Sequence, residues 1–402
     1  MKKVYIVAAK RSAIGSFLGT ISNVHPSDIG AHVLKTMLDE LSIPVDKIDE
    51  VLVGNILPAG LGQGVARQVS IKAGIPVEVP AYGVNMVCGS GMKTIMTGYA
   101  NIKLGLHNLV VAGGVEAMSL APYIVPAQVR AGVKMGDRAL VDHMINDALT
   151  DVFNNYHMGV TAENIATKYE ISREEQDNLA IESQNRAIAA QDRGEFVKEI
   201  VPYTIKNRRG DITFDQDEYI NRTTNSEKLG KLRPAFVKDG TVTAGNSSGI
   251  NDGVSFVLLA SEEMVEKLGL TPLAEIVGIG QGGVDPAYMG LGPVPAVRNA
   301  LLHANLNIKQ IDVFELNEAF AAQSLGVLRE LEKEHGVTKE YMLARTNLNG
   351  GAIALGHPVG ASGNRIVVTL IHQMLQHDKK LGLASLCIGG GMGTAIVLKK
   401  VK

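Results

Sequence analysis

One succession of segments occurs twice along this chain. Residues 88–114 run through a Cys-Gly-Ser-Gly turn, a segment with apolar residues at helical spacing, and a strand-like run that ends in two glycines. Residues 350–390 run through a glycine-rich turn around His357, a second helical segment and a second strand-like run that ends in glycines. A repeated supersecondary pattern of this kind indicates an internal duplication. We therefore predict two related halves that pack face to face.

The rest of the chain has the same α/β character. Residues 4–9 and 50–54 are typical of strands, and residues 28–41 between them carry apolar side chains at helical spacing. Alternation of strands and helices is typical of a mostly parallel sheet covered by helices. We expect two βαβ-type halves built in this way.

A more polar segment interrupts the pattern. Within it, Ser172-Arg173-Glu174-Glu175 is typical of a capped helix start. A cluster of turn-forming residues at 245–253 ends the segment, and the run 254–260 resumes a buried strand. We assign residues 1–120 plus 248–270 to an N-terminal half, residues 121–247 to an inserted loop domain, and residues 271–402 to a C-terminal half.

The bulk properties argue against several classes of protein. The formal net charge is −2 over 402 residues, which favours neither nucleic acid nor a membrane surface as a partner. No apolar run approaches the roughly 18 residues of a membrane span, and the apolar stretch near the start is too short for a signal peptide. The two cysteines lack the spacing of a zinc site or a disulfide framework. We expect no metal and a reducing, cytoplasmic setting.

Both cysteines lie beside glycines, which leaves space around their sulfur atoms. Cys88 precedes a predicted helix, whose N-terminus offers free N–H groups and partial positive charge that lower the pKa of a thiol. The thiolate is the form that attacks carbonyl groups. Cys88 is therefore a candidate nucleophile, although a buried structural cysteine explains its position equally well.

Three further residues carry candidate chemistry. His357 lies on a turn and not on an amphipathic helix face, and its imidazole can accept the proton of Cys88. Cys387 precedes three glycines whose N–H groups can surround an oxyanion; a plain junction between strand and turn is the alternative. Asn317 follows a buried strand, where its amide can orient a water or donate a hydrogen bond.

Four blocks of sequence together resemble the thiolase family. They are VCGSGMK from Val87, NEAFAAQ from Asn317, NGGAIALGHPVGASG from Asn349 and CIGGGMGTA from Cys387. The blocks follow the family order, and the match runs from the first strand to Lys400. The resemblance implies a five-layer α-β-α-β-α fold. The segment FNNYHMG at residues 153–159, together with Met289, is similar to the short-chain members that make acetoacetyl-CoA.

The resemblance implies a ping-pong acetyl-CoA C-acetyltransferase. Cys88 attacks a thioester and becomes acetylated while His357 accepts its proton, and coenzyme A leaves. Cys387 then removes a proton from the methyl carbon of a second acetyl-CoA, and the enolate attacks acetyl-Cys88 to give acetoacetyl-CoA. His357 and a water held by Asn317 would stabilise the enolate oxygen. The backbone N–H groups of Cys88 and Gly389 would form a second oxyanion hole, at about 3 kcal/mol per strong donor.

The resemblance also implies a binding site for coenzyme A, mostly on the inserted segment, and no permanently bound cofactor. The nucleotide contact assigned to Arg222 is the least supported, because the spacing from there to the Arg-Pro-Ala-Phe segment at 233–236 departs by one residue from the family pattern. We expect acetyl-CoA, acetoacetyl-CoA and coenzyme A as partners, and a homo-oligomer, either a dimer or a homotetramer. The expected contacts are Leu149, His157, Met158, Arg222, Phe236, Ala244, Ser248, Met289, Ala319 and Phe320.

Three other interpretations stay open from the sequence. A broad-chain degradative 3-ketoacyl-CoA thiolase would share the chemistry and differ in the acyl pocket. A decarboxylating ketoacyl synthase would lack the second cysteine, and a non-catalytic acyl-CoA carrier would need neither Cys88, His357 nor Cys387. Two thiols in one pocket also predict a reversible Cys88–Cys387 disulfide under oxidation, provided that their Cα separation allows it.

Overall fold

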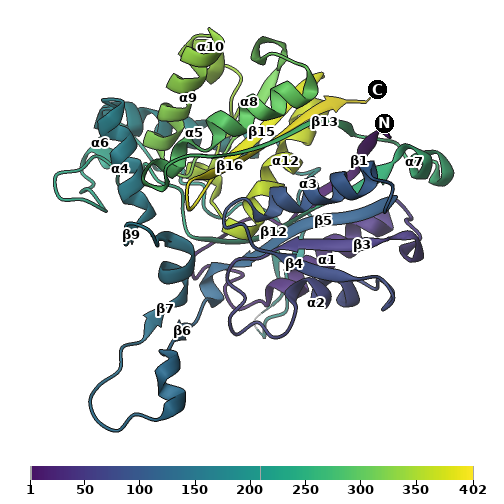
Figure 1. The fold of residues 1–402 in the computed structure, drawn as a ribbon, viewed down its shortest axis with the longest axis horizontal. Helices are drawn as coiled ribbons and strands as arrows, with labels where there is room; N and C mark the ends of the chain where they lie inside the picture. Colours follow the sequence, from purple (N-terminus) through teal and green to yellow (C-terminus); the bar gives the residue numbers. More distant parts are fainter. Residues whose placement is uncertain (1, 209, 402) are drawn as a thin grey trace.

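The structure is a computed structural model that describes residues 2–208 and 210–401; Met1, Arg209 and Lys402 lie outside the described residues. Its strands form two sets (Figure 1), and the pairing of the strands gives both sets the same spatial order. The first set reads β4 (Ala81–Val84), β3 (Glu50–Gly54), β5 (Leu109–Ala117), β12 (Asn251–Ser261) and β1 (Val4–Arg11). The second reads β14 (Val313–Leu316), β15 (Leu381–Ile388), β16 (Met392–Lys400) and β13 (Ala274–Gly283).

The two sets correspond strand by strand. Thr346 forms a bridge with Phe314 at the free edge of β14, which places it where β4 lies in the first set. With that bridge counted as a strand, each set has five strands. If these are numbered in the order in which they occur along the chain, both sets have the order 3-2-4-5-1 across the sheet. The predicted internal duplication is therefore present in the topology. The sets join where β1 pairs with β13 through Tyr5↔Glu275 and Ile6↔Ala274.

Helices fill three layers around these strands. Alternate residues of β5 point to opposite faces, as the pleat of a strand requires. Leu109 and Val111 pack in one core with α1 and α2, whereas Val110 and Ala112 pack in another with α3 and α12. A third core lies between the second set of strands and α8 with α9. The layers therefore run α-β-α-β-α. The bounds are α1 Pro26–Glu40, α2 Val65–Lys72, α3 Ser90–Lys103, α8 Pro293–Ala304, α9 Ala321–His335 and α12 Val359–Gln376.

The expectation of a mostly parallel sheet is wrong. β3 runs parallel to β4 and β5, and β14 runs parallel to β15, but the other pairs of the large sheet are antiparallel. The reason is visible between β15 and β16, which are joined by Gly389, Gly390 and Gly391 alone. So short a loop can connect only antiparallel strands. Gly390 and Gly391 have φ of 84° and 85°, values that favour glycine.

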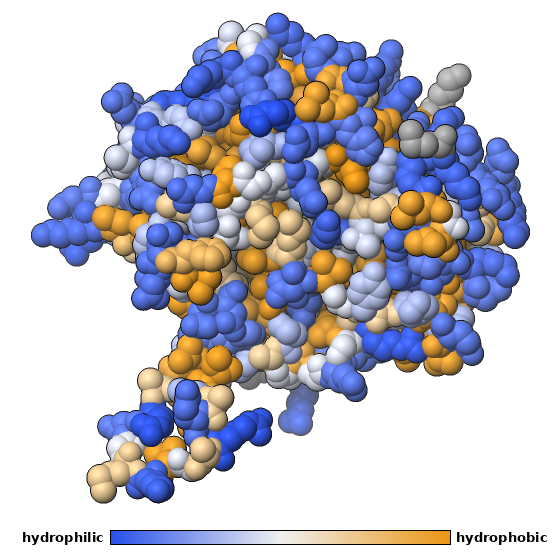
Figure 2. All heavy atoms as spheres, in the orientation of Figure 1, coloured by the Kyte–Doolittle hydropathy of each residue, from blue (hydrophilic) through white to orange (hydrophobic). Residues whose placement is uncertain are grey.

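The long connection between β5 and β12 carries the inserted segment. The predicted capping box at Ser172 and Glu175 is present at the start of α5. A narrow arm around β6 and β7 extends away from the body (Figure 1), and apolar side chains show on its surface in Figure 2. The elements of this connection are η2 Met118–Leu120, β6 Tyr123–Ile124, η3 Ala127–Ala131, β7 Val141–Asp142, η4 Ile145–Leu149, β8 Thr150–Asp151, β9 Tyr156–His157, α4 Met158–Lys168, α5 Arg173–Asp192, β10 Tyr203–Ile205, β11 Ile212–Phe214 and α6 Ser226–Gly230.

Short elements complete the described chain. Among the described residues, none of the helices is both long and apolar enough to span a membrane. The remaining elements are β2 Gly15–Ser16, η1 Val45–Lys47, α7 Glu262–Leu268, η5 Pro286–Leu291, η6 Ile308–Gln310, α10 Lys339–Leu343 and α11 Ala352–Leu355.

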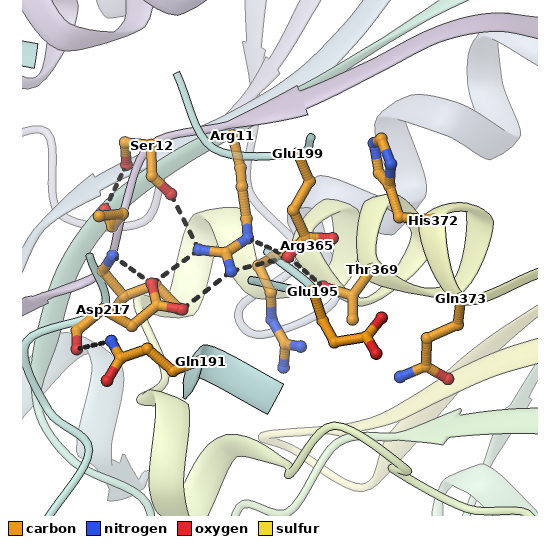
Figure 3. A network of polar contacts seen from close by, with 12 residues as sticks. Arg11, Ser12, Gln191, Glu195, Glu199, Asp217, Arg365, Thr369, His372 and Gln373 are labelled. Atoms are coloured by element: carbon orange, nitrogen blue, oxygen red, sulfur yellow. Dashed lines mark hydrogen bonds and ion pairs between the residues drawn. The ribbon is translucent and has the colours of Figure 1, made fainter. Parts of the chain in front are cut away.

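A buried ionic network ties the inserted segment to β1 (Figure 3). The guanidinium of Arg11 donates to both carboxylate oxygens of Asp217, at 2.7 and 2.9 Å, and to Glu199 at 2.7 Å. Burial opposes the charge on Arg11, but the two carboxylates outweigh it, so the pKa of Arg11 lies above its ordinary value. Arg365 of α12 lies beside this group and pairs with Glu315 at 3.5 Å.

The central helices cross where both carry glycine. A Cβ atom on Gly91 of α3 would lie 2.8 Å from the backbone nitrogen of Asn364, and one on Gly363 of α12 would lie 2.6 Å from that of Met92. Backbones approach this closely only where no side chain intervenes, so glycine is required at the crossing. The contact brings the N-terminal ends of α3 and α12 together in the middle layer.

Candidate active site

A tight turn carries Cys88 from the end of β4 to the start of α3. Val87 has a φ of 47°, which is unusual for a β-branched residue. The hydroxyl of Ser90 accepts from the N–H of Met86 at 2.8 Å and donates to the carbonyl of Val87 at 2.7 Å. Asn85 Oδ1 accepts from the N–H of Val87 at 3.1 Å. These bonds hold the backbone in this conformation, and Cys88 directly precedes Gly89, the N-cap of α3.

The thiol of Cys88 is less acidic than the sequence suggests. Burial raises its pKa to about 11, although a hydrogen bond from the backbone N–H of Gly389 works in the opposite direction. The expected lowering by the helix N-terminus is therefore outweighed. Cys88 is a thiol at neutral pH, and it needs a base when it reacts.

His357 lies in the loop between α11 and α12. Gly356 has a φ of 104°, and a Cβ atom there would lie 2.5 Å from the side chain of Asn251. Asn251 Oδ1 accepts the backbone N–H of His357 at 2.9 Å, and the ring Nδ1 lies 2.5 Å from Ser362 Oγ. Burial, then the positive charge of Arg365, lowers the pKa of His357 to about 4. The imidazole is therefore neutral near pH 7 and able to accept a proton.

Glu116 fastens the His357 loop to the first half. Its Oε2 accepts the N–H of Gly360 at 2.8 Å and that of Ile56 at 3.1 Å. Its Oε1 accepts from Asn55 Nδ2 at 2.9 Å and from the N–H of Leu57 at 3.1 Å. Burial raises the pKa of Glu116 to about 7 against the effect of these donors. The sequence reasoning missed Glu116, although a glutamate inside the apolar strand β5 was a visible signal.

Cys387 reaches the same place from the second half. It lies at the end of β15, directly before the three-glycine loop, and it is buried. Burial, then the neighbouring sulfur of Cys88, raises its pKa above the ordinary range of a thiol. Cys88, His357, Cys387 and Gly389 all line one cavity of about 450 Å³. A cavity of this size is typical of a small-molecule site.

Asn317 is not among the residues that line this cavity. Its backbone N–H donates to the carbonyl of Ser385 at 3.0 Å, which fixes the end of β14 against β15. Its side chain is buried, and neither the amide nitrogen nor the amide oxygen has a hydrogen-bond partner among the described residues. Buried polar atoms are rarely left unpaired. An amide in this state is suited to hold a small polar molecule.

Nine of the ten predicted contacts for coenzyme A line the cavity with the catalytic candidates. His157 stacks on Phe236 with ring centroids 4.7 Å apart, and Phe236 meets Phe320 edge to face at 5.9 Å. These three rings form an aromatic wall. Tyr219 and Met118 also line the cavity and were missed, because no local pattern distinguishes them. The nine are Leu149, His157, Met158, Phe236, Ala244, Ser248, Met289, Ala319 and Phe320.

Arg222 lies outside this cavity. Its guanidinium donates to Asp192 at 2.6 and 3.1 Å and to Gln191 at 3.0 Å, and its side chain is half exposed. Lys228 instead lines a neighbouring cavity of about 290 Å³. Tyr219 lines both cavities, so the two adjoin. Lys228 therefore lies beside the cavity that the cysteines line, whereas the guanidinium of Arg222 is paired with Asp192.

In each comparison with known proteins, the chain is similar to thiolases or acetyl-CoA acetyltransferases. The family model "Thiolase, N-terminal domain" matches residues 4–263, and "Thiolase, C-terminal domain" matches residues 270–400. The chain is 51% identical over 401 residues to an acetyl-CoA acetyltransferase of Pseudomonas aeruginosa, covering 100% of both chains.

Two solved structures are also similar. One is an acetyl-CoA acetyltransferase from Syntrophomonas wolfei, with a TM-score of 0.97, 40% identity and 100% of both chains covered. The other is human mitochondrial 3-ketoacyl-CoA thiolase, with a TM-score of 0.94, 42% identity, and 100% of this chain and 99% of that chain covered.

Proposed function

This chain belongs to the thiolase family of acyltransferases, and we propose that it condenses two molecules of acetyl-CoA into acetoacetyl-CoA and coenzyme A, and catalyses the reverse thiolysis, through an acetyl-Cys88 intermediate. The observation that carries the proposal is the single cavity lined by Cys88, His357 and Cys387. Two sulfurs and a neutral imidazole are the groups that this chemistry needs. A carrier protein would have no use for them.

In the first half-reaction, His357 Nε2 takes the proton of Cys88 as the sulfur attacks the thioester carbon. The carbonyl oxygen becomes an oxyanion in the tetrahedral intermediate. The backbone N–H groups of Cys88 and Gly389 are the donors that we assign to it. The hydrogen bond from the N–H of Gly389 to the sulfur of Cys88 supports this assignment. Oxyanion donors of this kind contribute about 3 kcal/mol each.

In the second half-reaction, Cys387 acts as the base on the methyl group of the second acetyl-CoA. The proton moves from carbon to the thiolate sulfur, and the enolate carbon attacks the acetyl group on Cys88. His357 and a water held by Asn317 stabilise the enolate oxygen. The unpaired buried amide of Asn317 supports that role.

A broad-chain 3-ketoacyl-CoA thiolase stays the second candidate, because human mitochondrial 3-ketoacyl-CoA thiolase is 42% identical over the whole chain. We favour acetoacetyl-CoA because the bulky rings of His157, Phe236 and Phe320 form an aromatic wall of the cavity that both cysteines line, which favours a short acyl group. Rates of thiolysis with acetoacetyl-CoA and with a long-chain 3-ketoacyl-CoA separate the two. Faster turnover of the long substrate would favour the second candidate.

Substrate binding and assembly complete the proposal. Residues 121–247, as an inserted domain that binds coenzyme A, supply Leu149, Met158 and Ala244 to the cavity. We also propose a cytoplasmic homo-oligomer, a dimer or a tetramer. Exposed apolar side chains on the projecting arm, among them Met135 and Leu140, support an assembly that covers them.

The decisive experiment detects the acyl-enzyme. Intact-mass measurement after exposure to acetyl-CoA is expected to show one added acetyl group, and peptide mapping to place it on Cys88. The variant Cys88→Ala is expected to show none. An acetyl group on another residue, or no adduct in the wild-type protein, would refute the proposed function.

A further inference from the structure

Ser362 is the hydrogen-bond partner of the buried nitrogen of the His357 ring. Its hydroxyl oxygen lies 2.5 Å from His357 Nδ1 and 2.9 Å from the carbonyl oxygen of Pro358, to which it donates. Donation to the carbonyl four residues earlier is common for serine in the first turn of a helix. Ser362 itself is fully buried in α12. The hydroxyl carries a single hydrogen, so its contact with Nδ1 needs a hydrogen from the ring.

The rest of the loop holds the ring in place for this contact. The backbone N–H of His357 donates to Asn251 Oδ1, and Asn251 Nδ2 in turn donates to the carbonyl of Gly15 at 3.0 Å. His357 lines the cavity, while its Nδ1 is turned into the protein against Ser362. Nε2 is therefore the ring atom left for the substrate. A neutral imidazole has one N–H, and its position decides whether Nε2 can accept a proton.

We propose that Ser362 is a positioning residue that holds His357 in the Nδ1–H tautomer, so that the lone pair of Nε2 faces Cys88 and the substrate. The proposal rests on the proposed function, because it assigns the atom that acts as the base in that reaction. In the opposite tautomer Nε2 would carry a hydrogen, and the ring could donate to an oxyanion but could not accept the proton of Cys88.

The proton balance follows from this arrangement. The S–H bond of Cys88 breaks as an N–H bond forms at Nε2, the new bond between sulfur and the acyl carbon closes, and the bond to the sulfur of coenzyme A opens. The departing thiolate then takes a proton from the thiol of Cys387. His357 keeps both hydrogens, Cys387 is left as the thiolate base for the second half-reaction, and Nε2–H faces the enolate oxygen. Where Cys387 is replaced, Nε2 can return its proton to the departing thiolate instead, so that acetylation of Cys88 still closes but no base is left for the second half-reaction. Both routes begin from the tautomer that Ser362 selects.

The tautomer is directly measurable by solid-state ¹⁵N NMR of protein labelled with ¹⁵N-histidine. Comparison with His357→Gln assigns the two ring signals. We expect a protonated Nδ1 and an unprotonated Nε2 in the wild-type protein near pH 7. This readout does not depend on turnover, so it stays informative even if the proposed function fails. A protonated Nε2 beside an unprotonated Nδ1 would overturn the proposal.

Kinetics supply the second test. General-base catalysis contributes about 10²- to 10⁴-fold to a rate, so Ser362→Ala is expected to slow single-turnover acetylation of Cys88 by about 100-fold. Half-saturation by acetyl-CoA should change little, because Ser362 does not line the cavity. Ser362→Thr keeps a hydroxyl and is expected to recover most of the rate.

Ser255→Ala is the matched control. It removes another buried hydroxyl that bonds to α12, through Asn364 Oδ1 at 2.7 Å, without contact to His357. Equal losses of rate in Ser362→Ala and Ser255→Ala would reduce Ser362 to a structural role. Unchanged acetylation in Ser362→Ala would contradict the tautomer assignment, whereas a wild-type protein that is never acetylated would instead refute the proposed function.

Discussion

The carboxylate of Glu116 accepts the backbone N–H of Gly360 at 2.8 Å, which joins strand β5 of the first half to the start of α12 in the second. The same carboxylate accepts from the loop after β3, through Ile56 and Leu57. His357 lies three residues before Gly360. Glu116 therefore ties the loop that carries His357 to the half that carries Cys88.

Replacing Glu116 by glutamine tests this connection. The amide nitrogen of the new side chain would face N–H donors, so at least one buried donor loses its acceptor, at a cost of about 1–3 kcal/mol. We expect Glu116→Gln to lower the free energy of unfolding by that amount in urea denaturation, and to slow acetylation of Cys88 because the His357 loop is released. Glu163→Gln is the control, since Glu163 also accepts backbone N–H groups, from Thr241 and Val242. An equal effect of both variants on acetylation would contradict the positioning role.

The architecture and the motifs of the site could be predicted because short, continuous stretches of sequence determine them. Glycines flank Cys88, His357 and Cys387, and apolar spacing marks the helices that follow. The contacts that organise the site could not, because they join distant stretches of chain. Glu116 meets Gly360, 244 residues away, and this pairing leaves no periodic signal.

Two features of the site depend on tertiary contacts that the local sequence does not show. The sequence places Cys88 at a helix N-terminus, but the degree of burial, which raises its pKa, follows from tertiary packing. Arg222 stays a predicted nucleotide contact, and in this structure its guanidinium pairs with Asp192 of α5. Which partner a long exposed side chain selects is not encoded in its own neighbourhood.

The raised pKa of Cys88 predicts distinct pH dependences for two reactions of the same sulfur. Alkylation of the free enzyme by iodoacetamide needs the thiolate. With a pKa of about 11, the thiolate fraction rises about tenfold per pH unit between roughly pH 7 and 10. We expect the alkylation rate to follow that rise.

In the proposed mechanism, acetylation depends instead on neutral His357, whose pKa is lowered to about 4. The neutral form is fully present above about pH 5 and is lost as the pH falls through 4. The titration of His357 should therefore leave the acetylation rate nearly unchanged from about pH 6 to 8, so that any change in this range is expected to come from Glu116, whose pKa is raised to about 7. Rates of both reactions are measured by intact mass, and an alkylation plateau near pH 7 would show that the thiolate forms without substrate.

The separate roles proposed for the two cysteines predict that each replacement removes a different step. In Cys387→Ala, the first half-reaction retains its nucleophile and His357, so the acetyl adduct on Cys88 is expected to form. Formation of acetoacetyl-CoA should be lost, because no base reaches the methyl group of the second acetyl-CoA. The adduct is followed by mass and the product by chromatography. If Cys387→Ala retained both acetylation of Cys88 and formation of acetoacetyl-CoA at comparable rates, the proposed division of roles would be wrong.

The aromatic wall predicts the acyl-chain preference. Phe236 packs between His157 and Phe320, and its replacement by alanine would open space inside the cavity. We expect Phe236→Ala to lower kcat/KM for acetoacetyl-CoA and to raise the ratio of long-chain to short-chain thiolysis. Phe153→Ala is the control, since that ring is largely exposed and does not line the cavity. An unchanged ratio in Phe236→Ala would remove the wall as the determinant.

The crossing of α3 and α12 predicts a coupled loss of stability and activity. In Gly363→Ala, the new methyl group would lie 2.6 Å from the backbone nitrogen of Met92, and this backbone cannot rotate away as a side chain would. The helices must separate, so the free energy of unfolding should fall by about 1–3 kcal/mol, the usual range for overpacking. Since these helices position Cys88 and His357, acetylation should slow as well. Gly230→Ala, in α6, is the control, because a Cβ atom there meets no atom within 4 Å. It should change the free energy of unfolding by no more than about 1 kcal/mol, and the rate of acetylation by no more than the corresponding factor. Urea denaturation and single-turnover acetylation measure both effects, and a fully active Gly363→Ala of wild-type stability would show that the crossing tolerates a side chain.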